Sequence, residues 1–169
     1  MSQLVPDGLY LIDKSAAGFE GSACIATSFP HGSNRLCTSS AREAGENMLK
    51  WEVKFDMDQQ AYTFRNPTTG HFISFDGEPD TNVHLCGQET PRLFTLTPSH
   101  EGINRIHIRA KDSDTDIDNS PLMIYPPLPP IARLQEAKGN VGPLAVGDCY
   151  QTESWGFPLV FLPNVVLPT

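Results

Sequence analysis

The feature that most constrains this chain is a weak threefold repetition of strand-like segments. Three segments begin an apolar alternation with a large aromatic residue, and these residues are Trp51, Phe94 and Trp155. They lie roughly fifty residues apart on average, which is a typical length for a repeated supersecondary unit. Similar segments open the same three units at residues 8–12, 61–65 and 105–109. Three such units predict an all-β closed barrel with a hairpin cap, the β-trefoil.

Twelve short strands are expected, four in each unit. Runs such as Tyr62-x-Phe64 and Ile106-x-Ile108 alternate with the period of two that a half-buried strand needs. The 15 prolines and 13 glycines separate such runs in the way that turns separate strands. The single expected domain, 1–169, divides approximately into units 8–56, 61–98 and 103–162. The expected strands are 9–13, 23–28, 35–39 and 48–55, then 61–65, 71–75, 82–86 and 92–97, and finally 104–110, 121–125, 131–135 and 155–161.

Three segments depart from the strand pattern. Residues 41–46 can form one helical turn, and Gly45 opposes a longer helix. Residues 139–153 form the longest irregular segment, a length that is typical of a functional or decorative loop. Residues 112–119 alternate carboxylates like a calcium loop of the EF-hand kind, but Ile117 stands where that loop needs glycine. A solvated acidic loop is therefore expected there.

Composition and charge exclude several classes of partner. A net charge of −8 argues against nucleic acid, because phosphate contacts need clustered Lys and Arg. The amino terminus lacks the basic and apolar regions of a secretory signal. No apolar run approaches the roughly 20 residues that span a bilayer. We therefore expect a cytoplasmic protein with no membrane partner.

No motif for catalysis, metal or cofactor is present. The histidines are scattered, and His107 is expected to face outward from its strand. The cysteines lack metal-site spacing, and free thiols are the default for a chain without a secretory signal. A disulfide between Cys24 and Cys37 stays open as an alternative. The sequence thus predicts a protein that is not an enzyme, binds no cofactor and acts through loops held by a rigid barrel.

Three stretches resemble the small cytosolic β-trefoils of mushrooms. They are residues 7–12, the run from Trp51 through Phe64, and residues 93–99. The chain length and the lack of a signal fit the mycocypins and related mushroom protease inhibitors. The resemblance implies a defensive protein that inhibits a papain-like, trypsin-like or legumain protease reversibly. The same patterns also occur in mushroom β-trefoil lectins.

For papain-like proteases, the resemblance implies docking by two loops of the first unit, residues 15–22 and 41–47. Small side chains in the first loop would let its backbone enter a narrow cleft. The residues expected to contact the protease are Ala16, Ala17, Gly18 and Phe19 in one loop and Glu43, Ala44 and Gly45 in the other.

A second implied mode presents one side chain to the specificity pocket of the protease. Arg35 or Lys138 suits a trypsin-like pocket that contains a carboxylate, and Asn34 suits legumain. Asn66 is a further candidate, and the following Pro67 would help it resist cleavage.

The alternative function is carbohydrate binding. The chain lacks the Gln-x-Trp repeats of ricin-type lectins, and its tryptophans are expected in core strands. A glycan site would instead use Tyr62, His71 or Tyr150. A structural or storage role without a specific ligand is a third reading.

Overall fold

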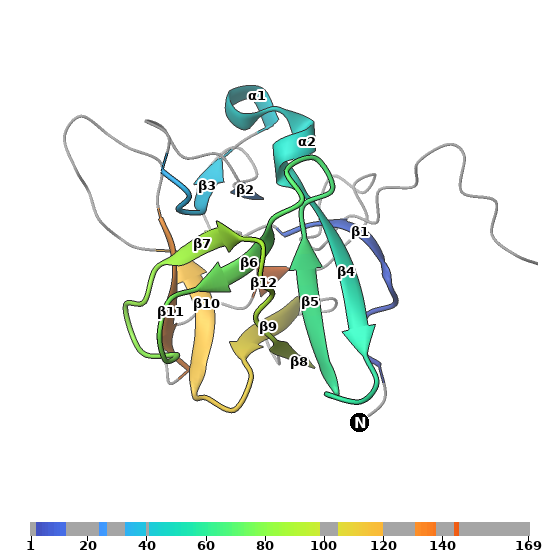
Figure 1. The fold of residues 1–169 in the computed structure, drawn as a ribbon, viewed down its shortest axis with the longest axis vertical. Helices are drawn as coiled ribbons and strands as arrows, with labels where there is room; N and C mark the ends of the chain where they lie inside the picture. Colours follow the sequence, from blue (N-terminus) through green and yellow to red (C-terminus); the bar gives the residue numbers. More distant parts are fainter. Residues whose placement is uncertain are drawn as a thin grey trace, which may run out of the picture.

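The structure is a computed structural model that describes residues 3–12, 24–26, 33–39, 41–98, 105–119, 131–137 and 144–145. Within these ranges the chain forms short strands and two helical turns (Figure 1). The elements are β1 (Gly8–Leu11), β2 (Cys24–Ala26), β3 (Cys37–Ser39), α1 (Ala41–Ala44), α2 (Glu46–Leu49), β4 (Lys50–Asp56), β5 (Ala61–Arg65), β6 (Phe72–Phe75), β7 (Leu85–Gln88), β8 (Phe94–Pro98), β9 (Arg105–Ala110), β10 (Thr115–Asn119), β11 (Ala132–Glu136) and β12 (Leu144–Ala145).

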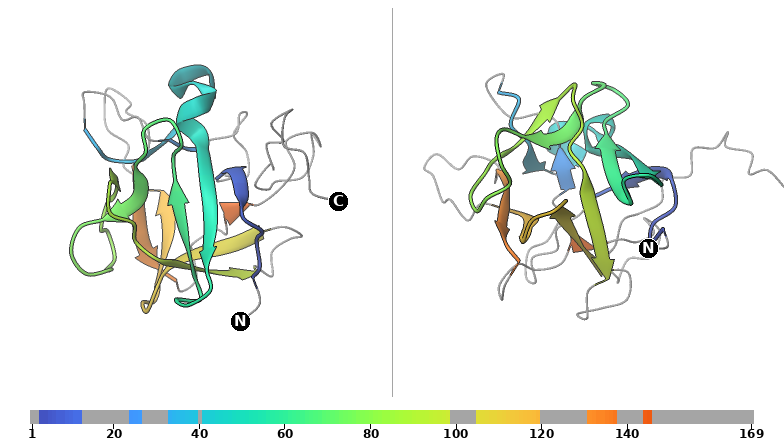
Figure 2. Two further views of the ribbon diagram at one scale, coloured as in Figure 1. Left: turned by 45° about the vertical axis from the view of Figure 1, so that its right-hand side comes forward. Right: turned by 60° about the horizontal axis from the view of Figure 1, so that its bottom comes forward.

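The strands divide into a wall and three hairpins. The wall runs in the antiparallel order β1-β4-β5-β8-β9, and β12 also pairs with β9. The hairpins are β2–β3, β6–β7 and β10–β11. Figure 2 shows the long strands β4 and β5 side by side in the wall. The first and fourth strands of each unit therefore form the wall and the middle two form a hairpin, which is the β-trefoil plan.

The three hairpins meet through backbone contacts around three evenly spaced leucines. Leu36, Leu85 and Leu134 are each fully buried. The Leu36 N–H donates to the Leu85 carbonyl at 2.9 Å, and the Leu134 N–H donates to the Val83 carbonyl at 2.8 Å. The Ala132 N–H donates to the Leu36 carbonyl at 3.0 Å. Each unit thus contributes one leucine to the centre of the cap.

Aromatic residues fill the core between the wall and the cap. Trp51, Phe64 and Phe94 are fully buried, and the rings of Phe64 and Phe94 meet edge to face at 5.6 Å. The Trp51 Nε1–H donates to the Ile25 carbonyl at 2.9 Å, so this tryptophan also ties the wall to β2. Burial of each such side chain contributes about 1.5–3 kcal/mol. The expected core position of Trp51 is therefore confirmed, and Phe94, which was expected on a strand, lies in the core as well.

Most expected strands are present, with local shifts that have physical reasons. Residues 48 and 49 belong to α2, so β4 begins at Lys50. Asn82 adopts a φ of 71°, and this turn delays the start of β7 to Leu85. The short strand β12 lies in the segment expected to be irregular. The expected strands 121–125 and 155–161 lie outside the described residues.

The acidic run at 112–119 is not a solvated loop, because its second half is the strand β10. Asp116 lies on this strand with only 1% of its surface exposed. The Arg109 Nε–H donates to Asp116 Oδ1 at 2.8 Å, and His107 Nδ1 lies 3.3 Å from Oδ2. The half-buried His107 therefore faces a carboxylate and not open solvent. Opposite charge on the neighbouring strand β9 is what makes burial of Asp116 tolerable.

Cys37 and Cys86 are buried thiols that are not disulfide-bonded, so the alternative of a Cys24–Cys37 disulfide is wrong. The ladder of β2 and β3 places Cys24 opposite Ser39 and Cys37 opposite Ala26. Burial, and next the charge of Glu43, raises the pKa of Cys37 to about 11.

Long apolar helices and metal clusters were also sought in the described ranges. No helix there is long and apolar enough to cross a membrane. The same residues contain no group of three or more His, Cys, Asp and Glu side chains placed to hold a metal ion.

Candidate functional site

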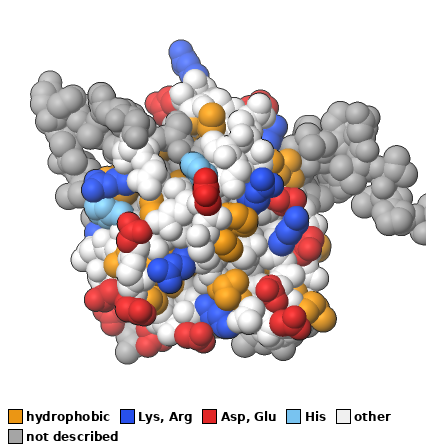
Figure 3. Space-filling view, viewed as in Figure 1, with side chains coloured by type: hydrophobic (Ala, Val, Ile, Leu, Met, Phe, Trp, Pro, Cys, Tyr) orange, Lys and Arg blue, Asp and Glu red, His pale blue; other side chains and the backbone are white. Residues whose placement is uncertain are grey.

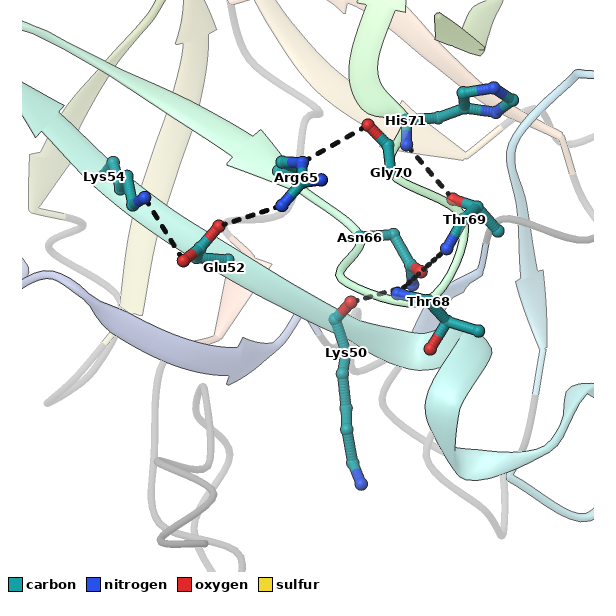
Figure 4. A network of polar contacts seen from close by, with 9 residues as sticks. All are labelled: Lys50, Glu52, Lys54, Arg65, Asn66, Thr68, Thr69, Gly70 and His71. Atoms are coloured by element: carbon teal, nitrogen blue, oxygen red, sulfur yellow. Dashed lines mark hydrogen bonds and ion pairs between the residues drawn. The ribbon is translucent and has the colours of Figure 1, made fainter. Parts of the chain in front are cut away.

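The turn between β5 and β6 is built around Asn66 (Figure 4). Asn66 Oδ1 accepts from the backbone N–H groups of Thr68 and Thr69, both at 2.9 Å. Asn66 Nδ2 donates to the carbonyls of Asn47 and Lys50 at 3.0 and 2.9 Å. The side chain is fully buried and each of its polar atoms is bonded. In this conformation Asn66 is unavailable to a protease pocket, contrary to the sequence-based expectation.

A row of charges runs beside this turn on β4 and β5. Glu52 lies 3.3 Å from Lys54 Nζ and 3.7 Å from Arg65 Nη1 (Figure 4). The Arg65 Nε–H also reaches the Gly70 carbonyl at 3.4 Å. The Arg65 side chain is 44% exposed, and exposed pairs of this kind contribute little to stability. We interpret these charges as a solvated surface that supports the turn.

The segment of residues 41–49 projects from the barrel as two helical turns. Figure 1 shows α1 and α2 above the start of β4. Gly45 separates them with a φ of 81°, which confirms the expected interruption at this glycine. Glu43 and Gly45 are exposed, whereas Ala44 packs against the small apolar cluster that includes Leu49. The Ser39 hydroxyl donates to Glu43 Oε2 at 3.1 Å and holds the start of the segment.

The remaining predicted site residues are dispersed. Asn34 and Arg35 are exposed at the edge of the cap, where the Gly87 N–H donates to the Asn34 carbonyl at 2.8 Å. Tyr62 is buried, and its hydroxyl accepts from the N–H groups of Leu4 and Val5, so it cannot support a sugar ring. The predictions for Ala16, Ala17, Gly18, Phe19, Lys138 and Tyr150 lie outside the described residues.

A different set of polar side chains is organised on the β6–β7 hairpin. Ser74 lies opposite Cys86, and Phe72 lies opposite Gln88, so these four residues share one face of the hairpin. The Ser74 hydroxyl donates to Gln88 Oε1 at 2.9 Å. Gln88 Nε2 then donates to Asp76 Oδ1 at 2.7 Å. A buried hydroxyl thus orients an amide, and the amide orients an exposed carboxylate.

Arg92 fixes the backbone on both sides of that carboxylate. Its Nε–H donates to the Phe75 carbonyl at 3.2 Å, and Nη2 donates to the Gly77 carbonyl at 2.9 Å. The guanidinium lies 4.7 Å from the centre of the Phe75 ring, a cation–π distance. Because residues 75 and 77 are both held, Asp76 is presented in one orientation. We call this set the Asp76–Gln88 surface, and its members are Phe72, Ser74, Asp76, Gln88 and Arg92.

The sequence alone did not predict this surface. Asp76 and Gln88 are twelve positions apart in the chain and meet only through the β6–β7 ladder. Arg92 approaches from the segment that follows β7. His71, a predicted glycan contact, is half-buried next to Gly87 and points away from the Asn66 turn (Figure 4).

No protein-family model matches the chain, and neither does any curated protein. Among solved structures, the Macrolepiota procera ricin B-like lectin in complex with lactose is similar over 93% of this chain and 99% of that chain, with a TM-score of 0.69 and 15% identity. The Rhizoctonia solani agglutinin is similar over 85% of this chain and 96% of its own, with a TM-score of 0.59 and 17% identity.

The Polyporus squamosus lectin, bound to Neu5Acα2-6Galβ1-4GlcNAc, is similar over 85% of this chain and 49% of that chain, with a TM-score of 0.60 and 15% identity. At such low identity these likenesses concern the fold alone. The chain therefore has the β-trefoil fold of the ricin B-like lectins.

Proposed function

We propose that this chain binds carbohydrate and that the Asp76–Gln88 surface is its saccharide site. Two observations support the proposal. The fold is shared with lectins that were solved with saccharides bound. The surface also combines oriented polar groups with an aromatic side chain, which is the composition that a small polar ligand requires.

The polar half of the surface suits sugar hydroxyl groups. A hydroxyl donates one hydrogen bond, and an ionised carboxylate accepts several. Asp76 receives one bond from Gln88 and is exposed, so its carboxylate keeps acceptor capacity for a ligand. Hydrogen bonds to a charged acceptor are roughly twice as strong as neutral ones. Because Asp76 is already oriented, binding loses less side-chain entropy.

The apolar half of the surface suits the C–H face of a sugar ring. Phe72 is half-buried and lies directly opposite Gln88 in the ladder. A ring that packs on Phe72 would therefore have its hydroxyl groups close to the Gln88 amide. The observation that carries the proposal is this fixed chain from Ser74 through Gln88 to Asp76, which ends on an exposed carboxylate beside an aromatic side chain.

The test is calorimetric titration of a saccharide selected on a glycan array. Asp76→Asn should weaken binding by about tenfold or more, since it replaces a charged acceptor by a neutral one. Asp112→Asn is the matched control, because Asp112 is also exposed and its φ of 59° is one that asparagine tolerates. Equal affinity of Asp76→Asn and the unchanged chain would move the site elsewhere.

Protease inhibition is a second candidate function, favoured by the projection of residues 41–49. Gly45 is exposed, and a Cβ added to it would meet nothing within 4 Å, so the tip can approach a partner closely. The test is titration of papain, trypsin and legumain at equal concentrations. Gly45→Trp should abolish papain inhibition by blocking entry to the cleft, and Arg35→Ala should abolish trypsin inhibition. An absence of inhibition of all three enzymes by the folded chain would remove this candidate.

A further inference from the structure

Two arginines and one histidine gather on one face of the hairpin cap. An isolated bridge pairs Arg35 with Cys86, and another pairs His84 with Arg133. His84 and Cys86 are two residues apart along the chain at the start of β7, so strand alternation places their side chains on the same face. Arg35, His84 and Arg133 each adjoin one of the buried cap leucines. We call these three residues the basic cluster.

Basic and acidic side chains are unevenly distributed over the surface. Figure 3 shows blue and pale-blue side chains gathered at the left-hand side of the molecule, with acidic side chains along the lower edge. Arg35 is exposed, and His84 and Arg133 are half-buried. The cluster is therefore a local cationic area on a chain whose net charge is −8.

The basic cluster lacks the carboxylate partners that other cations on this chain possess. Arg65 and Arg109 form ion pairs with Glu52 and Asp116. Within the part of the chain that the structure describes, no member of the basic cluster forms one. The charges of Arg35 and Arg133 are therefore not neutralised by an ion pair within the described chain, and they can attract an external anion.

Neutral amides orient the Arg133 guanidinium. Its Nη1 donates to Asn82 Oδ1 across the cap. Gln135, two residues along β11, can turn its amide oxygen toward the same group, where it accepts from Nε at 2.9 Å and Nη2 at 3.0 Å. An arginine has five N–H donors, so this arrangement leaves donors free for a ligand. Arg133 is thus held in place without losing its charge.

The two arginines are close enough to His84 to affect its titration. Burial lowers the pKa of His84, and the charges of Arg35 and Arg133 lower it further. One carboxylate borders the group, because Asp118 lies opposite Arg133 in the β10–β11 ladder. A bound oxyanion would compensate the positive charges of Arg35 and Arg133, and planar guanidinium groups suit sulfate and carboxylate oxygens.

The basic cluster and the Asp76–Gln88 surface lie on one continuous face. Gln88, Cys86 and His84 alternate along the same side of the β7 segment, and Gln88 Nε2 lies 3.2 Å from Cys86 Sγ. Four residues of extended chain span roughly 13 Å, a distance that a short oligosaccharide can bridge. We propose that Arg35, His84 and Arg133 bind the sulfate or carboxylate group of an anionic saccharide whose neutral part lies on the Asp76–Gln88 surface. This inference rests on the proposed carbohydrate binding.

The first experiment titrates the full chain with inorganic sulfate and follows the imidazole signals by NMR. Sulfate should shift the His84 signals, and Arg35→Gln should reduce that response by about tenfold in affinity. Arg42→Gln is the matched control, since Arg42 is exposed on α1 away from the cluster. Asp118→Asn should strengthen sulfate binding by removing a bordering negative charge. Failure of sulfate to move the His84 signals would overturn the assignment of the cluster.

The second experiment compares neutral saccharides with their sulfated and sialylated forms on one glycan array. Stronger binding of either charged form, lost in Arg35→Gln and retained in Arg42→Gln, supports the inference and identifies the oxyanion. Equal binding of neutral and charged forms overturns it and leaves the proposed function intact. A sulfate response at His84 without binding of any saccharide overturns the joint site and the proposed function, while the cluster remains an anion site. Arg133→Gln provides an independent check if Arg35→Gln fails to fold.

Discussion

Polar side chains differ in burial and in hydrogen bonding between two regions of the molecule. One region is the Asn66 turn, and the other is the face that the Asp76–Gln88 surface shares with the basic cluster. Every polar atom of the Asn66 side chain is bonded inside the protein, and the side chain is fully buried. Asp76 is exposed with one oriented bond, and Arg35 is exposed without a described ion pair. A saturated, buried polar group stabilises the fold, whereas an exposed and oriented one remains able to bind a ligand.

The largest expected effect is on the free energy of unfolding, which should fall when a buried, fully bonded polar side chain is removed and not when an exposed one is. Asn66→Ala removes four hydrogen bonds that hold the β5–β6 turn and join it to α2 and the start of β4, so it should lower the free energy of unfolding by about 2–4 kcal/mol. Asn34→Ala, at an exposed position, should change it by about 0.5 kcal/mol or less. Urea denaturation measures both values. Similar changes in the free energy of unfolding for Asn66→Ala and Asn34→Ala would contradict the structural role of the Asn66 side chain.

Asp116 offers an intermediate case, because it is buried and also charged. Arg109→Ala would leave its carboxylate without the 2.8 Å partner, so unfolding should become easier by about 2 kcal/mol. The effect stays below that of a fully buried pair because the Arg109 side chain is 32% exposed. Arg109→Lys should restore part of the loss. If Arg109→Ala left the free energy of unfolding unchanged in urea denaturation, solvent and not Arg109 would stabilise the Asp116 carboxylate.

A smaller and pH-dependent effect is expected at Cys37. The folded state raises its pKa from 9.0 to about 11, so the folded protein disfavours the thiolate. The corresponding stabilisation is complete below pH 9 and is lost as the pH rises toward 11. Alkylation by iodoacetamide at pH 8.5, followed by mass spectrometry, should therefore modify Cys37 only after unfolding. Rapid modification in the native protein would show that the thiol is accessible.

The smallest effect on stability is expected in the basic cluster. Arg35→Gln should change the free energy of unfolding by about 0.5 kcal/mol or less, because the side chain is exposed. It should nevertheless raise the pKa of His84, since it removes one of the two charges that lower that pKa. An NMR pH titration of the imidazole measures this change. If Arg35→Gln left the pKa of His84 unchanged, the Arg35 charge would lie too far from His84 for the two residues to bind the same anion.

The sequence predicted the architecture because local signals agreed with it. The aromatic residues Trp51 and Phe94 begin apolar alternations on expected strands, and both fill the core. Residues 112–119 are rich in carboxylates, which predicts an exposed loop. The prediction is wrong because Arg109 on the preceding strand pairs with Asp116 and allows this part of the run to be a buried strand. A local reading of charge does not contain that pairing.

The candidate site was less accessible to sequence reasoning for the same reason. Asn66 followed by Pro67 predicts an exposed turn, but the Asn66 amide donates to the carbonyls of Asn47 and Lys50, at α2 and just after it. Asp76, Gln88 and Arg92 come together only through strand register and the long turn between β6 and β7. The tertiary structure determines which polar side chains have all their hydrogen bonds within the protein. The type of a single residue does not predict this.

The most direct test of this account is a backbone NMR titration of the full chain with the saccharide that binds best on an array. The account predicts shifts centred on residues 72–77, 84–88 and 92, which extend to residues 35 and 133 when the saccharide is anionic, with the signals of residues 66–70 unchanged. Shifts centred on residues 41–47, or no shifts at saturating saccharide, would contradict the assignment of the Asp76–Gln88 surface as the binding site.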